Sequence, residues 1–254
     1  MKNQKLWRGV QIFLAVVLLA SGLRLLLIYR GRHQPLRSPA QTEQAPPLDA
    51  DAYVVPEKLH AYDLKSAREL AGKTVWVRAG YGVAFYPYSP ASERADFSKE
   101  AGVLAPIQKL EIRDVLLIPS PQSNAWQGPA NARFRLHLEG KQVMAVFQQG
   151  GKDFAFPVGT VINGDYHLFI DEVLYMQDPH QLYRHWPAAT WQAIEQHKIL
   201  PGMNELQTSF AIGVPDSASD NSPDRTLHYP NGGHPLEVTY QSGKVASATV
   251  VTSR

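Results

Sequence analysis

Three histidines close to several acidic residues are the first candidates for chemistry in this chain of 254 residues. The six side chains are His180, His185, His197, Asp171, Glu172 and Asp178. Imidazole and carboxylate groups together can bind a metal ion or relay protons. Their spacings match no established metal site or catalytic motif, so the sequence favours surface and structural roles, and we expect no metal site.

The adjacent acids Asp171 and Glu172 are the second candidate, as a pair for acid–base catalysis. We expect them in a strand, where neighbouring side chains point to opposite faces and cannot act together. The sequence also has no phosphate-binding loop, no dinucleotide-binding glycine fingerprint, no G-x-S-x-G and no H-E-x-x-H. We therefore predict no catalytic residue and no cofactor.

Four aromatic residues are the best candidates for a binding surface: Tyr81, Phe85, Tyr86 and Tyr88. Glycines and prolines among and around them predict a loop. Aromatic side chains on loops can dock peptides or glycans. The alternative is a small core buried beneath a long loop, and the sequence leaves both interpretations open.

Composition narrows the possible functions. Apolar residues make up 44% of the chain and charged residues 19%, a balance that allows a globular core. The net charge of +2 is too small to indicate a nucleic-acid surface, so we expect no nucleic-acid partner. The absence of cysteine excludes disulfides, thiol catalysis, iron–sulfur clusters and a lipid attached to an N-terminal cysteine.

An apolar segment at residues 10–29 begins at Val10 and ends at Tyr29. Twenty helical residues span about 30 Å, the thickness of a bilayer core, so we predict a transmembrane helix. The alternative is a cleaved signal peptide, because basic residues precede the segment and small residues occur at Ala20 to Gly22. Basic residues flank both ends almost equally, and the signal-like start favours an N-terminus inside.

The sequence therefore predicts a single-pass protein of the inner (cytoplasmic) membrane, with the bulk of the protein periplasmic or extracytoplasmic. We expect a short tail at residues 1–9 and a proline-rich linker at residues 30–60 that extends from the membrane. A mainly β domain is predicted at residues 61–180 and an α+β domain at residues 181–254.

Period-two alternation is the main signal in the predicted β domain. Strands are expected at 74–78, 110–118, 134–138, 143–147, 154–158 and 166–175, with one short helix at 64–71. Asn163-Gly164 predicts a tight hairpin. Alternating apolar residues joined by glycine turns indicate an antiparallel sheet with one buried face, and several such strands often curl into a small barrel.

The last part of the sequence changes to helical period. Trp191, Ile194 and Lys198 mark one helix, and Asn204 with Gln207 predicts a capping box for a second helix. Strands are expected at 226–229, 236–241 and 245–252. The fold class predicted for the whole protein is therefore α+β.

This C-terminal part resembles the SmpA/OmlA family, the small lipoprotein of the outer-membrane β-barrel assembly machinery and its envelope relatives. The residues that carry the resemblance are Trp191, Ile194, Gly202, Met203, Leu206, Gln207, Ile212, Gly213, Pro215, the strand at 236–240 and the turn at 243–245. The resemblance implies two helices packed on one face of a short antiparallel sheet. It also implies a non-enzymatic role through contacts with envelope proteins or lipid.

Together these observations predict a membrane-anchored interaction or scaffolding module of the cell envelope, bound to the membrane through residues 10–29. The expected partners are envelope proteins or lipid. The alternative is an envelope hydrolase whose site is assembled from distant histidine and carboxylate residues, because a catalytic triad is a spatial arrangement rather than a sequence motif.

Overall fold

The computed structural model describes residues 22–26, 29, 50–120, 140–216 and 222–251. The protein divides into two compact units, Met1–Asp49 and Ala50–Arg254, and the second is called the body below. In the first unit the described residues are helical, and Leu23, Leu25 and Leu26 are more than half exposed. No helix within the described residues is long and apolar enough to cross a membrane. Most of the predicted span at residues 10–29, like residues 30–49 of the predicted linker, lies outside them.

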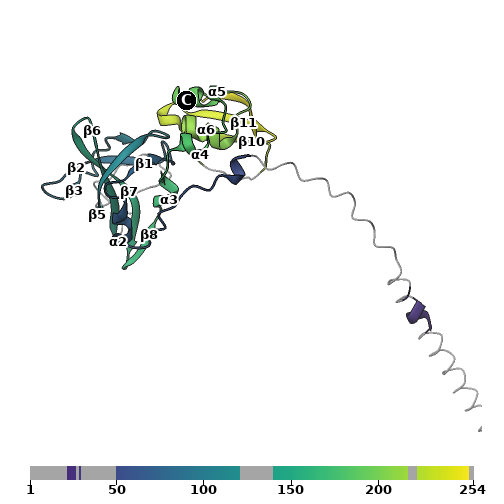
Figure 1. The fold of residues 1–254 in the computed structure, drawn as a ribbon, viewed down its shortest axis with the longest axis horizontal. Coiled ribbons are helices and arrows are strands. Elements are labelled where there is room, and N and C mark those ends of the chain that lie inside the picture. Colours follow the sequence, from purple (N-terminus) through teal and green to yellow (C-terminus); the bar gives the residue numbers. More distant parts are fainter. Residues whose placement is uncertain (1–21, 27–28, 30–49, 121–139, 217–221, 252–254) are drawn as a thin grey trace, which may run out of the picture. The chain divides into compact units, whose positions relative to one another are not determined.

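The body is α+β, with one large antiparallel sheet and a second sheet of three strands (Figure 1). The strands of the large sheet are β1 Thr74–Val77, β2 Ala84–Ser89, β3 Arg94–Ala95, β4 Gly102–Val103, β5 Lys109–Pro119, β6 Lys141–Gln149, β7 Lys152–Ile162, β8 Asp165–Leu168 and β9 Leu174–Tyr175. Their order is β3-β2-β7-β6-β5-β1-β9, while β4 also pairs with β2 and β8 with β7. The antiparallel sheet is thus confirmed, and the strand predicted at 134–138 lies outside the described residues.

The β7–β8 hairpin forms where the sequence predicted it. Ile162 pairs with Asp165, so Asn163 and Gly164 alone make the turn. Both have positive φ, 54° and 95°, as a type I′ turn requires. The turn therefore fixes the register of β8 against β7.

The sheet is buried on both faces around β6, whereas the sequence predicted one buried face. Val143, Ala145 and Phe147 belong to one core, and Met144 and Val146 belong to another on the opposite face. The second core also contains side chains from β2 and from the loop between β3 and β4. The period-two pattern is hidden in β6 because apolar residues occupy both faces.

Two local predictions were wrong. The expected loop around Phe85 contains strand β2, which tolerates Pro87 at a position where its carbonyl still accepts from Asp96 N. The expected strand at 166–175 is interrupted by helix α3, Ile170–Val173. The backbone N–H groups of Arg78 and Ala79 bond to Val173 O and hold the end of this helical turn against β1.

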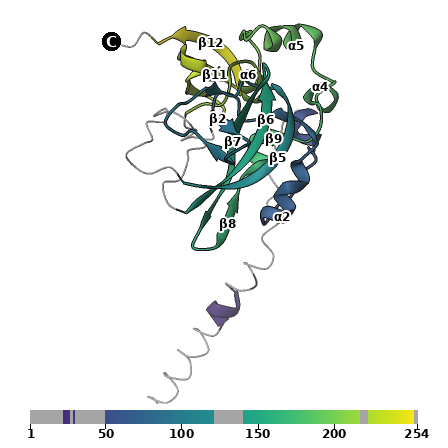
Figure 2. The same ribbon diagram turned by 90° about the vertical axis from the view of Figure 1, so that its left-hand side faces the viewer.

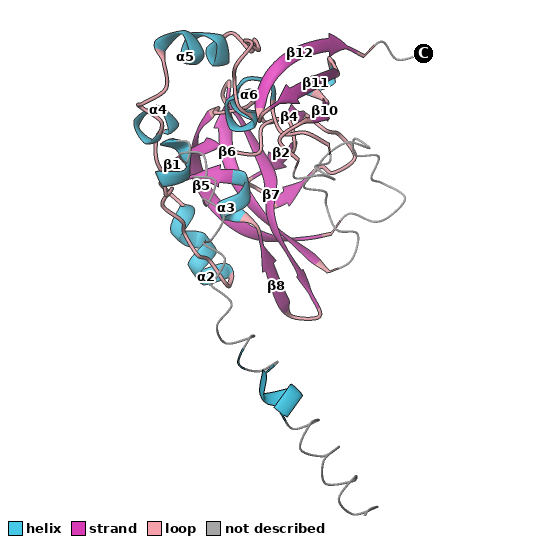
Figure 3. Ribbon diagram, turned by 90° about the vertical axis from the view of Figure 1, so that its right-hand side faces the viewer, coloured by secondary structure: helices cyan, strands magenta, loops and turns pink. Residues whose placement is uncertain are grey.

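The C-terminal elements agree closely with the predicted pattern. They are α4 Pro179–Leu182, α5 Ala188–Glu195, α6 Glu205–Ile212, β10 Arg225–Tyr229, η3 Asn231–Gly233, β11 Leu236–Gln241 and β12 Lys244–Val250. Asn204 and Gln207 form the predicted capping box of α6. Phe210 of α6 shares a core with Val238 and Tyr240 of β11, so α6 covers one face of the small sheet (Figure 3).

Residues 50–62, which precede the large sheet, are called the strap and lie along the rest of the body. The strap comprises η1, Ala50–Tyr53, and an extended stretch that leads to α2, Leu64–Ala67, and η2, Arg68–Leu70 (Figure 2). The Asp51 carboxylate accepts hydrogen bonds from His185, Trp186 and Asn204, each at 2.6 Å. Residues 50–60 of the predicted linker therefore contact the body.

The two sheets also share a core. Tyr175 of β9 lies in the same buried cluster as Phe210 and Tyr240, and Trp76 of β1 packs against that cluster. The body is accordingly one compact unit. A domain boundary near residue 180 stays a prediction.

Candidate binding groove

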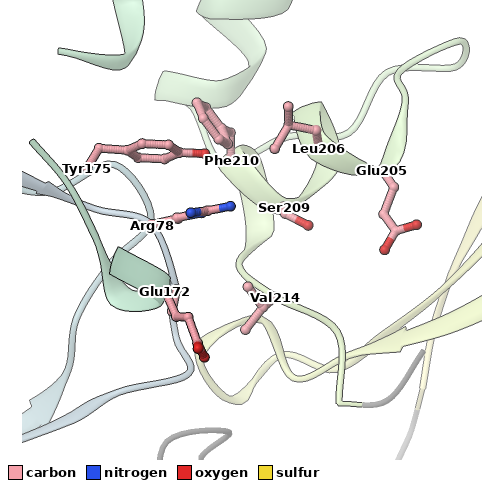
Figure 4. A pocket seen from close by; sticks show the side chains of 9 residues that line it. Arg78, Glu172, Tyr175, Glu205, Leu206, Ser209, Phe210 and Val214 are labelled. Carbon is pink, nitrogen blue, oxygen red and sulfur yellow. The ribbon is translucent and has the colours of Figure 1, made fainter. Parts of the chain in front are cut away.

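A groove of about 570 Å³ lies between the α3–β9 end of the large sheet and helix α6 (Figure 4). Its described lining is Arg78, Ala79, Glu172, Tyr175, Glu205, Leu206, Ser209, Phe210 and Val214. These residues come from the end of β1, from α3 and β9, and from α6 with the segment that follows it. The volume is within the range of small-ligand and peptide side-chain sites.

Arg78 is held in place at the centre of this groove. It directly follows β1, and its backbone N–H donates to Val173 O at 2.7 Å. Its Nη1 donates to Asp171 O at 2.8 Å, and its guanidinium carbon lies 5.3 Å from the centre of the Tyr175 ring. The side chain extends from the sheet toward α6 (Figure 4). These contacts fix an otherwise flexible side chain in one orientation.

Aromatic rings form the floor of the groove. Tyr175 is only 1% exposed and packs edge-on against Phe210, with ring centres 5.7 Å apart. Burial raises the pKa of the Tyr175 phenol well above its usual value, so this hydroxyl stays protonated at neutral pH. Tyr183, Trp186 and Trp191 continue the ring packing behind Phe210. The floor is therefore rigid and apolar.

Two acidic side chains border the groove. Glu205, in the first turn of α6, forms an ion pair with Arg225 of β10. Glu172 on α3 is exposed and lies on the other side of Arg78 from Tyr175 (Figure 4). The groove thus has a cation and two acids beside an aromatic floor. Of the two acids, Glu205 is the one that forms an ion pair within the described part of the protein.

The α6 side of the groove depends on how that helix ends. Gly213 has φ 87° and ψ −174°, a conformation that is essentially restricted to glycine. The turn at Gly213 lets Val214 N donate to Gly80 O at 3.0 Å. Val214 and Leu206 then supply apolar surface to the groove.

The four predicted binding residues are not part of this groove. Phe85 and Tyr86 are buried, with ring centres 5.5 Å from Phe147 and 5.3 Å from Phe97 respectively. Tyr81 and Tyr88 are partly exposed. A binding role for the group stays a prediction, and only Tyr81 and Tyr88 present substantial surface to a partner.

The three predicted histidines have separate structural partners. His180 stacks on Trp191 and bonds to Asp178, His185 bonds to Asp51, and His197 Nδ1 lies 3.0 Å from Ala211 O. Across the parts of the sequence that the structure describes, no group of three or more histidine or acidic side chains could hold a metal ion.

The side chains of Asp171 and Glu172 have different neighbours in the structure. The Asp171 carboxylate accepts from the backbone N–H groups of Leu59 and His60 in the strap, at 2.7 and 3.0 Å. Glu172 faces the groove. The two residues lie on the helical turn α3 rather than in the expected strand, and the expectation that they do not act together stays a prediction.

Sequence reasoning missed Arg78, which directly follows a short strand and belongs to no motif. The α6 residues that line the same groove are about 130 positions away in the sequence. The only local signal was a charged residue directly after a buried strand. No sequence pattern connects that residue with α6.

Comparisons with known proteins found no match: no family model fits the sequence, and no curated protein or solved structure matches it. The class is defined by the fold and the groove. The protein is α+β, with a large antiparallel sheet, a second three-stranded sheet, and a charged groove between the end of the large sheet and α6.

Proposed function

We propose that this protein is a membrane-tethered interaction module of the cell envelope, and that its body docks a partner segment in the groove between α3 and α6. The observation that carries the proposal is Arg78, which is already positioned above a buried aromatic floor. An ordered cation can orient a ligand through hydrogen bonds, and the apolar surface beside it can bury part of that ligand. A specific docking site requires both.

The finer description of the fold belongs to the same proposal. We take residues 61–180 as a barrel-like β domain and residues 181–254 as a unit similar to the SmpA/OmlA family. Support comes from α6, which begins with the expected capping box and packs on the expected three-stranded sheet. The resemblance favours contacts with envelope proteins or lipid over catalysis.

The tether is residues 10–29, with the N-terminus inside and the body in the periplasm or outside the cytoplasm. Leu23, Leu25 and Leu26 support this assignment, because the three side chains point in different directions around the helix and all are exposed. Arg24 lies among them, and its long side chain can extend to the lipid headgroups while the leucines face lipid. In this proposal the helix takes the place of the lipidated cysteine of the family.

Site-specific photo-crosslinking tests the docking proposal. A benzoylphenylalanine at Leu206, which lines the groove, should give a covalent adduct with a partner in intact cells. The matched control is Leu200, a leucine of similar chemistry that is 37% exposed and outside the groove lining. An adduct pattern shared by both positions would count against docking in the groove.

The envelope hydrolase remains an alternative without a favouring observation. Its candidate histidines are engaged in separate contacts with Trp191, Asp51 and the Ala211 carbonyl.

A further inference from the structure

Arg78 differs from the arginines that form ion pairs in the body. Arg113 pairs with Asp153 and Arg225 pairs with Glu205. Among the described residues, no carboxylate oxygen lies within 4 Å of the Arg78 guanidinium, although its Nη1 donates to the Asp171 carbonyl. A guanidinium offers five N–H donors in a fixed planar arrangement, and Arg78 uses them on Asp171 O and on the Tyr175 hydroxyl, so further donors remain for a ligand.

The geometry suits a planar acceptor. The contact with Asp171 O and the Tyr175 ring hold the guanidinium plane, while the side chain is exposed toward the groove. A carboxylate matches two parallel N–H donors of arginine, and this bidentate pairing is stronger and more directional than a single contact with lysine. Because the orientation of Arg78 is already fixed, binding requires little additional ordering of this side chain.

The neighbouring acids restrict the charge of the ligand. Arg225 largely neutralises Glu205 through their ion pair. Within the described part of the protein, no basic nitrogen lies within 4 Å of the Glu172 carboxylate. Glu172 lies on the other side of Arg78, where its negative charge opposes a second anionic group (Figure 4). The groove therefore favours one carboxylate over a multiply charged group such as a phosphate.

The apolar lining of the groove offers a second contact to a ligand, besides the one with Arg78. Leu206, Phe210 and Val214 lie on the α6 side of the groove, within one pocket with Arg78. A ligand that places a carboxylate on Arg78 can place an aliphatic side chain on these residues if both groups point the same way. In an extended segment, side chains two residues apart share a face, and a C-terminal residue carries both a carboxylate and a side chain on one Cα, so a short extended peptide can offer both groups to the groove.

We propose that the groove recognises a single carboxylate of an extended partner segment, read by Arg78, with a neighbouring aliphatic side chain packed on Leu206, Phe210 and Val214. This inference rests on the proposed docking function. The carboxylate can come from an acidic side chain or from the free C-terminus of the partner, and the same experiment separates the two sources.

The test is a titration of the full-length protein in lipid nanodiscs, followed through the arginine Nε–Hε signals in NMR spectra. Three acetylated tripeptides are compared: Glu-Ala-Leu amide and Gln-Ala-Leu amide, whose first and third side chains share a face when the peptide is extended, and Ala-Ala-Leu with a free C-terminus. Either the glutamate peptide or the peptide with a free C-terminus should shift the Arg78 signal at millimolar concentration, and the glutamine peptide should not. Binding of the glutamate peptide identifies an acidic side chain as the source of the carboxylate, and binding of the other identifies the C-terminus.

Variants test the role of Arg78 itself. Arg78→Gln should weaken binding of the active peptide by about tenfold or more, and Arg78→Lys should weaken it by a smaller factor, since lysine keeps the charge but loses the planar donor pair. Both variants lack the Arg78 signal, so their binding is followed through backbone signals of Leu206. Glu172→Gln should strengthen binding by roughly two- to fivefold because it removes an opposing charge. Arg94→Gln, an exposed arginine on β3, is the matched control and should bind like the unmodified protein.

Equal binding by the Arg78→Gln variant, equal binding of the glutamine peptide, or no binding of any peptide would overturn the carboxylate assignment. A parallel loss in Arg94→Gln would also overturn it, because the effect would then be general charge. Unchanged thermal unfolding of each variant excludes misfolding as the cause. If the Leu206 adduct persists in cells while these titrations fail, docking in the groove stands and only the carboxylate is wrong.

Discussion

At the scale of single residues, Asp51 connects the strap to three distant side chains. Its carboxylate accepts from His185 Nε2, Trp186 Nε1 and Asn204 Nδ2, each at 2.6 Å. Trp186 is 5% exposed, so its indole N–H would lose a buried partner without this carboxylate. Asn204 is also the N-cap of α6, so Asp51 lies next to the helix that forms one side of the groove.

Replacing Asp51 by Ala should therefore lower the free energy of unfolding by roughly 2–3 kcal/mol, which urea denaturation followed by fluorescence can measure. Glu57→Ala, an exposed carboxylate in the same strap, is the control and should change stability by less than about 0.5 kcal/mol. Limited proteolysis should cut the strap faster in the Asp51 variant. Equal stability of the two variants would show that the Asp51 contacts do not hold the strap.

Two buried phenols predict weaker stability in alkali. Burial raises the pKa of Tyr175 and of Tyr229 above the usual value of 10.0. In the unfolded protein these groups lose their protons near pH 10, whereas in the folded protein they keep them. Their contribution to stability is therefore complete below about pH 10 and is lost as the pH rises above it.

Tyr229→Phe tests this pH dependence. It removes the hydrogen bond to the Tyr240 hydroxyl, 2.7 Å long, and should cost about 1 kcal/mol at pH 7. Above pH 10 the stability of the variant should fall less steeply, by about 1.4 kcal/mol per pH unit, because one proton fewer is lost on unfolding. Urea denaturation between pH 7 and pH 11 gives the slope, and identical slopes for the two proteins would contradict the buried-phenol account.

At the scale of elements, the end of α6 determines how this helix meets the loop after β1. A Cβ atom on Gly213 would lie 2.5 Å from Gly80 O and 2.8 Å from the Tyr81 ring. Gly202 has nearly the same φ, +85° against +87°, but a Cβ there would meet no atom within 4 Å. Gly202→Ala therefore measures the cost of a positive φ without crowding, whereas Gly213→Ala adds both the crowding and the glycine-restricted ψ of −174°.

Gly213→Ala should cost roughly 2–4 kcal/mol, while Gly202→Ala should cost about 1 kcal/mol from its backbone conformation alone. Differential scanning calorimetry can compare the two variants. Similar losses would mean that neither the ψ of Gly213 nor the contact with the Gly80 carbonyl adds a cost.

The same elements show what the sequence could and could not predict. The Asn163-Gly164 turn and the Asn204 capping box were predictable because each depends on residues a few positions apart. Strand β2 was missed because its pairing with β7 compensates for Pro87, and local propensity does not include distant pairing. The groove was missed for a similar reason, since Arg78 and α6 come together only through the shared core.

At the scale of the whole molecule, the strap, the groove and the two sheets are connected within one body. Asp171 provides a direct link, because its carboxylate holds the strap backbone and its carbonyl holds Arg78. Tyr175 links the groove floor to the core of the small sheet. The part of the molecule that leads to the proposed tether is therefore packed on the same body that presents the proposed docking site.

The most direct test of this account is photo-crosslinking of the full-length protein in cellular membranes, with benzoylphenylalanine at Leu206 or at Leu200. We predict a discrete adduct from Leu206 that stays in the membrane fraction after alkaline extraction, is absent from Leu200, and weakens in an Arg78→Gln background. The absence of a Leu206-specific adduct, or its recovery from the soluble fraction alone, would contradict the account of a membrane-tethered module that docks its partner in this groove.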